Sequence, residues 1–307
     1  MISESNISKK LGLGISGHKD IDFLDVNSNR DTALFADPCL IECCTDDFSK
    51  DCSNTITDYF KHLHAVFKAN KHRDIYQHLS HLGERNEARL GYGNGHNGKA
   101  KTPDGMAKTL SGLRYLIQHD IPLERAIDMA LLMPRFAEDC MSDMLMNILY
   151  KQFSEYTVQQ CQILGIPTSR SSKKRYYWDS KNHCWSIYEG ESLIIDGEII
   201  LLIPKRYVCT RLYCSTERYF MSKIAPMLQR RDTVIIDGKE QKPNKNDIRK
   251  NESKKYGSLL SAVIEHTIEN PQLLNDYHLD IPQKYANRCL SDDVLDSILY
   301  GNTSENT

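Results

Sequence analysis

The chain has 307 residues, of which 40% are hydrophobic and 26% charged, and its formal net charge at neutral pH is −2. This composition is typical of a globular protein and excludes a collagen-like, coiled-coil or largely disordered chain. No segment approaches the roughly 18 consecutive apolar residues of a transmembrane helix. The polar start MISESNISKK lacks the apolar region of a secretory signal. We therefore expect a cytoplasmic protein with no membrane partner.

Helical patterns dominate the first 167 residues. Apolar residues at helical spacing predict helices over residues 56–69, 75–82, 106–118 and 123–133, and a long helix over 137–164. The segment around Asp37-Pro38 is apolar and predicts a short extended stretch with a turn.

The pattern changes after Pro167. Strands are predicted over 183–188 and 199–203, and the Asp-Gly pairs at 196–197 and 237–238 predict two hairpins. Further helices are predicted over 217–228, 259–269 and 292–300. The sequence thus predicts an α+β fold with a mainly helical region, 1–167, and a basic, strand-containing region, 168–307, within one domain or two.

The charge is unevenly distributed along the chain. Residues 1–60 and 261–307 each carry a net charge of −6, whereas residues 168–260 carry +8. Such a basic segment suits contact with nucleic acid. The alternative is a solvated loop region that pairs with the two acidic ends.

Cysteine and histidine offer no familiar zinc motif. The closest group of the ten cysteines is Cys39, Cys43, Cys44 and Cys52, which lacks the CxxC spacing of zinc sites. His62 and His64 are two apart and do not share a helix face. We expect reduced, mostly buried thiols and histidines that lie on the surface or bond within the core.

One predicted helix carries a polar stripe. Asp139, Asp143 and Asn147 follow one another at intervals of four on a segment rich in Met, Leu and Ile. Oxygen ligands at this spacing suit Mg²⁺, which takes one or two carboxylates plus phosphate oxygens. The alternative is the ordinary solvent face of an amphipathic helix.

Two further segments suit phosphate. The stretch GYGNGHNGK contains Gly93, Gly95, Gly98 and Lys99 ahead of a predicted helix, where backbone N–H groups and a lysine can hold an anion. It does not match a Walker A loop, and a surface loop is the alternative. Lys205 follows a buried strand, as in nucleases that deliver a lysine to a metal centre, or it simply faces solvent at the strand end.

Four segments in this order, DTALFADPCLI, LGYGNGHNGKA, AEDCMSDMLMNILYKQFSEYT and IILLIPKRYV, resemble a family of uncharacterised bacterial proteins. The resemblance covers roughly residues 25–210. The chain departs from the family pattern in the GHNGK ending of the glycine-rich segment and at Ala137-Glu138-Asp139. The family looks like part of anti-phage defence or mobile gene islands. The resemblance places Asp37, Asp139, Asp143, Asn147 and Lys205 on motif positions.

Together these features predict a metal-dependent nuclease, or another component that acts on nucleic acid in anti-phage defence. Asp139 and Asp143 would hold Mg²⁺, and Lys205 would neutralise the scissile phosphate. The first alternative is a non-catalytic sensor or adaptor that binds a partner ATPase or helicase. The second is an enzyme that binds or modifies nucleotides through the glycine-rich segment.

Overall fold

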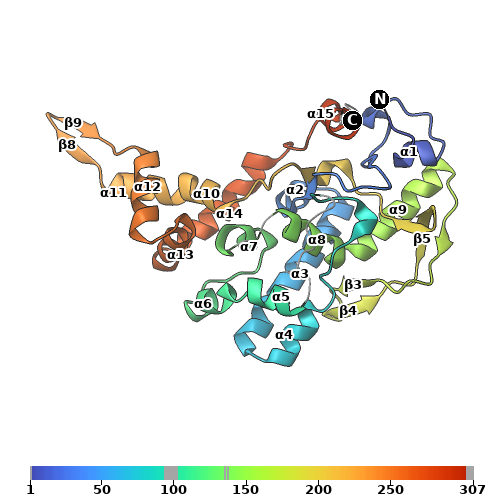
Figure 1. Ribbon diagram of the computed structural model, residues 1–307. Helices are drawn as coiled ribbons and strands as arrows, with labels where there is room; N and C mark the ends of the chain where they lie inside the picture. Colours follow the sequence, from blue (N-terminus) through green and yellow to red (C-terminus); the bar gives the residue numbers. More distant parts are fainter. Residues whose placement is uncertain (1, 93–102, 135, 137, 302–307) are drawn as a thin grey trace, which may run out of the picture.

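The computed structural model describes residues 2–92, 103–134, 136 and 138–301. Its fold is α+β, as predicted, with helices dominating the N-terminal part and most strands in the C-terminal half (Figure 1). Among the described residues, no helix is both long and apolar enough to cross a membrane.

Helix α3 (Asp47–Ala69) runs through the middle of the body (Figure 1). The side chain of Asp46 caps its start by accepting the backbone N–H of Ser49 at 3.1 Å. Asn70 ends the helix in the left-handed conformation, with φ at 52°. One face of α3 is buried, and its apolar members are Cys52, Ile56, Tyr59, Phe60, Leu63 and Phe67.

The other helices up to residue 164 surround α3 or pack near it. They are α1 (Ile7–Lys10), α2 (Pro38–Cys43), α4 (His72–Leu79), α5 (Pro103–Thr109), α6 (Gly112–Gln118), α7 (Ala126–Leu132), α8 (Glu138–Ile148) and α9 (Tyr150–Leu164). The single helix predicted over 137–164 is therefore two, since the backbone leaves helical geometry at Leu149 (φ −94°, ψ 16°). The helix predicted over 106–118 is also divided, into α5 and α6.

The strands are short and form small antiparallel sheets. They are β1 (Phe35–Ala36), β2 (Ser169–Arg170), β3 (Tyr176–Asp179), β4 (Cys184–Ile187), β5 (Glu191–Ile195), β6 (Glu198–Ile200), β7 (Val208–Cys209), β8 (Val234–Ile236) and β9 (Lys239–Gln241). Both Asp-Gly hairpins are confirmed: β5 pairs with β6 and β8 with β9. Each turn has the two positive φ angles that such a hairpin requires, for example 52° at Asp196 and 81° at Gly197.

Backbone pairing joins the two predicted regions. Strand β1 pairs with β7, and the N–H of Leu201 donates to the carbonyl of Glu87 at 2.8 Å. The apolar core likewise includes buried residues from both sides of Pro167. The strand-bearing segment 169–209 therefore packs on the helical region.

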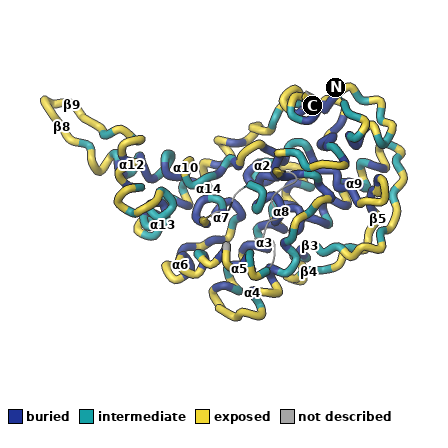
Figure 2. Tube along the Cα trace, viewed as in Figure 1, coloured by how far each residue is buried: buried dark blue, intermediate teal, exposed yellow. Residues whose placement is uncertain are grey.

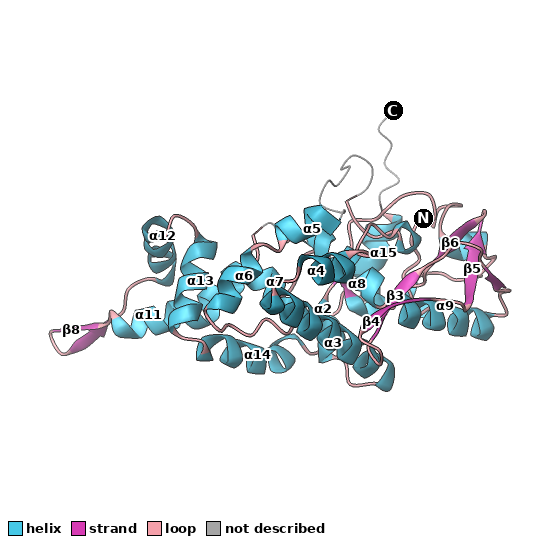
Figure 3. Ribbon diagram, turned by 90° about the horizontal axis from the view of Figure 1, so that it is seen from below, coloured by secondary structure: helices cyan, strands magenta, loops and turns pink. Residues whose placement is uncertain are grey.

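The chain after residue 215 is again mainly helical. It forms α10 (Thr216–Tyr219), a π-helical turn (Phe220–Ile224), α11 (Ala225–Arg231), α12 (Lys245–Lys255), α13 (Leu259–Glu269), α14 (Gln272–Tyr285) and α15 (Asp292–Tyr300). Strands β3–β6 lie at one end of the molecule and the β8–β9 hairpin lies at the other (Figure 3). Helix α15 returns to the N-terminal segment, where Asp296 contacts Nδ1 of His18 at 2.6 Å.

Candidate metal centre

Asp143 and Asn147 of the polar stripe of α8 face the interior instead of solvent, and Asp139 is half-buried. Asn147 is 1% exposed and Asp143 is 8% exposed. The Asn147 amide nitrogen donates to the carbonyls of Gly83 (2.6 Å) and Asp143 (2.7 Å). Its amide oxygen accepts from Nε of Arg85 at 2.7 Å. These contacts give Asn147 a structural role, joining α8 to residues 83–85, and direct its oxygen at a guanidinium.

Arg85 lies near enough to Asp143 for their charges to interact. Its guanidinium lies 5.0 Å from the centre of the Tyr150 ring and donates to the carbonyl of Tyr176 at 3.3 Å. Burial lowers the pKa of Arg85, and nearby acids, Glu87 first and Asp143 also, oppose that shift. A fixed positive charge next to Asp143 disfavours a second cation there.

Asp139 lies one turn earlier, against Gly91. Its Oδ1 would be 2.9 Å from a Cβ at position 91, where φ is 131°, so only glycine fits beside it. Gly93, Gly95, Gly98 and Lys99 lie outside the described residues. The assignment of Mg²⁺ to Asp139 and Asp143 therefore stays a prediction.

Lys205 has structural partners. Its Nζ lies 2.8 Å from Oδ1 of Asp292 and donates to the carbonyl of His18 at 2.6 Å. These contacts join the short helical turn Lys205–Tyr207 to α15 and the N-terminal segment. Lys205 is therefore tied to the N-terminal segment and to α15.

Asp37 is a buried helix cap. Its Oδ1 accepts the N–H of Cys39 (2.8 Å) at the start of α2, and its Oδ2 accepts the N–H of Tyr213 (2.6 Å). Burial raises the pKa of Asp37, while these hydrogen bonds act in the opposite direction. Asp37 thus fixes the junction between α2 and the chain after β7.

Sequence analysis missed a different group of three side chains that could hold a metal ion. Asp58 and His62 lie one turn apart on α3, and His183 approaches from the turn between β3 and β4. Each of the three offers a ligand atom, and these atoms all lie within 4.8 Å of one another. Nδ1 of His183 is 3.0 Å from Oδ1 of Asp58, and Nδ1 of His62 is 3.5 Å from the same oxygen.

Trp178 on β3 holds the carboxylate in place. Its indole Nε1 donates to Oδ2 of Asp58 at 2.7 Å, which leaves Oδ1 directed at the two histidines. Nδ1 of His62 also lies 3.0 Å from the carbonyl of Asp58. A ring nitrogen that donates to a carbonyl has no free lone pair, so His62 would bind an ion through this atom only after giving up that hydrogen bond. A ligand whose orientation is set by a second group binds metal more tightly, because less freedom is lost on binding.

His183 occupies an unusual backbone position. It has φ of 53° at the end of the β3–β4 turn, a left-handed conformation in which glycine is favoured. Its ring stacks on His62 with centroids 4.1 Å apart and planes 20° apart. Parallel rings do not point both lone pairs at one ion, so coordination requires rotation of one ring. The side chain of His183 is 49% exposed and has room to turn.

The cluster borders a pocket of about 390 Å³ with aromatic walls. Trp178, Trp185, His78 and His183 are among its lining residues. His78 is buried and stacks on Tyr59 with centroids 4.4 Å apart. Burial lowers the pKa of His78 to about 3, so its ring is neutral at neutral pH. The pocket therefore has a candidate metal ligand, His183, at its edge and flat aromatic side chains along its walls.

Two imidazoles and one carboxylate suit a transition ion such as Zn²⁺ or Mn²⁺ better than Mg²⁺, which prefers oxygen ligands alone. Three protein ligands leave coordination positions for water or substrate. The pairing of Asp58 with His62 four residues later is visible in the sequence, whereas the contribution of His183 required the folded hairpin.

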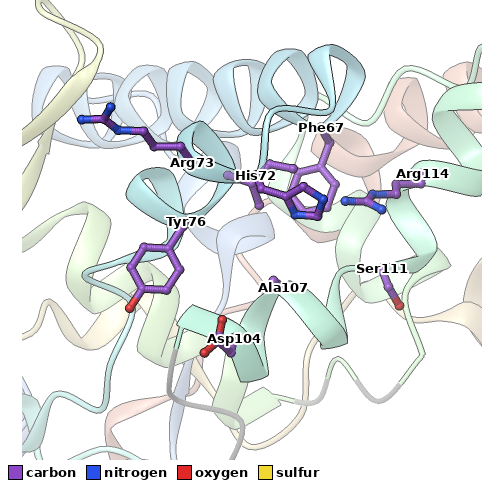
Figure 4. A pocket seen from close by; sticks show the side chains of 9 residues that line it. Phe67, His72, Arg73, Tyr76, Asp104, Ala107, Ser111 and Arg114 are labelled. Atoms are coloured by element: carbon purple, nitrogen blue, oxygen red, sulfur yellow. The ribbon is translucent and has the colours of Figure 1, made fainter.

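A second pocket of about 450 Å³ lies beside α4, α5 and α6 (Figure 4). His72, Arg73 and Arg114 contribute basic groups to its lining, and Asp104 contributes a carboxylate. The guanidinium of Arg73 points away from Asp104 in Figure 4, so these polar groups do not converge on one ligand position. We therefore base the candidate site on the Asp58 cluster.

One family model matches the chain, that of DUF8370, a domain of unknown function, over residues 12–215. The match includes all three residues of the cluster. No curated protein and no solved structure matches the chain.

Proposed function

Because the chain belongs to the DUF8370 family, whose description assigns no activity, we propose a function from the site itself: metal-dependent hydrolysis of phosphodiester bonds in nucleic acid. The observation that carries this proposal is the Asp58, His62 and His183 cluster, whose ligand atoms lie within 4.8 Å of one another. An ion held by these residues would lower the pKa of a bound water and polarise a phosphoryl oxygen.

The proposed reaction needs only water as co-reactant. Asp58, His62 and His183 would hold an ion that makes a water more acidic. The water would lose a proton to solvent, its oxygen would form a bond to phosphorus, and the bond from phosphorus to one sugar oxygen would break. The leaving sugar oxygen takes a proton from solvent. An ion at this position would also supply positive charge to the negative phosphoryl oxygens.

Aromatic side chains beside the ion support a nucleic-acid substrate. Trp185 and His81 line the pocket, and their rings lie 5.5 Å apart between centroids. Stacking on such rings binds any base through its flat face. The resemblance to proteins of defence and mobile gene islands and the basic charge of residues 168–260 favour the same target.

The test uses the isosteric variant Asp58→Asn, which keeps an oxygen for the Trp178 indole. Purified protein is incubated with labelled single-stranded DNA, duplex DNA and RNA, with Zn²⁺, Mn²⁺ or Mg²⁺, and with EDTA. We expect cleavage with a transition ion and no cleavage in EDTA. In Asp58→Asn the cleavage rate should fall by at least about 100-fold, because the loss of a ligand weakens binding of the ion.

The matched control is the double variant Asp139→Asn, Asp143→Asn, which removes the other candidate carboxylates. If cleavage is lost in the double variant but kept in Asp58→Asn, the metal site would be assigned to α8 instead of the Asp58 cluster. Absence of cleavage under every condition would contradict the hydrolase and favour the non-catalytic adaptor.

A further inference from the structure

The β8–β9 hairpin projects from the body of the protein, and helix α12 packs beside its base on α11 and α13. We call residues 230–255, which contain β8, β9 and α12, the basic arm. Every residue from 234 to 242 is exposed, and the hairpin points away from the rest of the chain (Figures 1 and 2). Val234, Ile235 and Ile236 are 53%, 76% and 47% exposed. Side chains of a strand alternate between its two faces, so Val234 and Ile236 share one face of the hairpin and Ile235 lies on the other. Apolar side chains exposed on both faces suit contact with a partner.

The basic arm carries uncompensated positive charge. It contains nine Lys and Arg residues against five Asp and Glu. Arg231 pairs with Asp232 and Lys242 with Glu240, while Arg249 pairs with a residue outside the arm. The remaining cations that form no ion pair with a described residue are Arg230, Lys239, Lys245, Lys250, Lys254 and Lys255.

Two of these cations, Lys250 and Lys254, lie on the exposed side of helix α12, opposite its buried residues. Its buried residues are Ile248 and Glu252, and Glu252 is held by Nε2 of His266 at 2.6 Å. Lys250 and Lys254 are both exposed and lie four residues apart, so they share a face of the helix. The Cβ atoms of residues one helical turn apart lie about 5–6 Å from each other. The two ammonium groups can therefore reach neighbouring phosphates of one nucleic-acid strand.

We propose that the basic arm binds duplex nucleic acid, with α12 along the phosphate backbone and the apolar hairpin inserted in a groove. The uncompensated cations favour a polyanion over an apolar protein partner. Isoleucine side chains at the tip suit insertion between base steps, as in proteins that bend DNA through the minor groove. The arm lies outside residues 12–215, so it is separate from the segment that matches the family.

This inference rests on the proposed function for its target class, and it names the surface that holds the target. The experiment measures binding in EDTA, where no cleavage occurs, so its result does not depend on the metal centre. Fluorescence anisotropy of a labelled duplex of about 20 base pairs is recorded at several salt concentrations. The proteins compared are the wild type, the double variant Lys250→Ala with Lys254→Ala, and Ile235→Ser.

We expect the double lysine variant to bind at least about tenfold more weakly, and the slope of log K against log salt to fall by about 2. Ile235→Ser is expected to bind more weakly without a change in that slope, because an apolar contact releases no counterions. The matched control is Lys9→Ala with Lys19→Ala, which removes two exposed charges from the N-terminal segment and is expected to leave the slope unchanged.

Equal affinity and slope in the wild type and the double lysine variant would overturn the proposal. So would self-association of the wild type that Ile235→Ser abolishes while duplex binding persists, since the hairpin would then join two copies of the chain. Failure of cleavage alone, with arm-dependent binding intact, would contradict the proposed hydrolysis and leave this surface supported.

Discussion

Nδ1 of His183 lies 3.0 Å from Oδ1 of Asp58, although the two residues are 125 positions apart in the chain. The β3–β4 hairpin brings them together by packing against α3 through Trp178, which is 2% exposed and whose indole binds the same carboxylate. The cluster therefore depends on the docking of a short hairpin on a long helix. The first two predictions test this arrangement.

Trp178→Phe should weaken metal binding without removing a ligand. The change deletes the indole donor that holds Oδ2 of Asp58, and loss of such an orienting hydrogen bond typically lowers affinity by about 10- to 100-fold. The matched control is Trp185→Phe, because the Trp185 indole donates to the carbonyl of His78 at 2.8 Å and not to Asp58. Zn²⁺ titration of both variants measures the effect. An equal loss of Zn²⁺ affinity in the two variants would mean that the pocket walls cause the effect, and would count against a positioning role for Trp178.

His183→Gly should remove a ligand and keep the fold. The left-handed backbone of His183 costs about 1 kcal/mol, which glycine recovers. The exposed contact of His183 with Asp58 is worth less than about 1 kcal/mol. We expect a free energy of unfolding within about 1 kcal/mol of the wild type in urea, together with at least tenfold weaker Zn²⁺ binding. Unchanged Zn²⁺ affinity in a folded variant would exclude His183 as a ligand.

His78 should make the protein less stable in mild acid. Burial lowers its pKa in the folded protein to about 3, from an ordinary value of 6.5. Between these two values the unfolded chain binds one proton more than the folded chain, so the contribution of His78 is complete above pH 6.5 and is lost as pH falls. One such group gives a slope of about 1.4 kcal/mol per pH unit.

Urea unfolding of the wild type and His78→Gln between pH 7 and 4 tests whether His78 lowers the free energy of unfolding as the pH falls. The variant has no group that titrates at position 78, so we expect a shallower fall in its free energy of unfolding. His119→Gln, at an exposed position, is the control. Parallel curves for the wild type and His78→Gln would show that the imidazole does not stay neutral in the fold.

Asp37→Ala should be strongly destabilising. It leaves the buried N–H groups of Cys39 and Tyr213 without their acceptor and removes the cap of α2, at a total cost of about 2–4 kcal/mol. Asp46→Ala, which removes the exposed cap of α3, should cost about 1 kcal/mol. Thermal unfolding compares the two. A loss of stability in Asp37→Ala no larger than the loss in Asp46→Ala would contradict the buried structural role of Asp37.

Local signals located several elements correctly. Helices α13 and α15 begin and end at the predicted residues, because each starts at a capping serine and repeats apolar residues at helical spacing. Helix α14 was not predicted, since its sequence is largely polar and contains Pro282. The first two turns of α3 were also missed, because they bury the small or polar residues Ser49, Cys52 and Thr55 instead of large apolar ones.

The candidate site shows where local patterns stop being informative. The stripe on α8 has the spacing of a solvent face, yet Arg85 and Gly83, from a distant segment, bind Asn147 and cover it. His62 and His64 do not share a face of the helix. The residue that faces His62 is Asp58, one turn earlier on α3. The third ligand comes from a turn whose docking on α3 depends on tertiary packing by Trp178. No spacing rule along the chain encodes that contact.

Isothermal titration of the purified protein with Zn²⁺ tests the central claim most directly. It compares the wild type, Asp58→Asn, and the double variant Asp139→Asn, Asp143→Asn. We predict one site per chain in the wild type, the same site in the double variant, and its loss in Asp58→Asn. Wild-type binding that persists unchanged in Asp58→Asn, or no binding by the wild type, would contradict a metal centre at Asp58, His62 and His183.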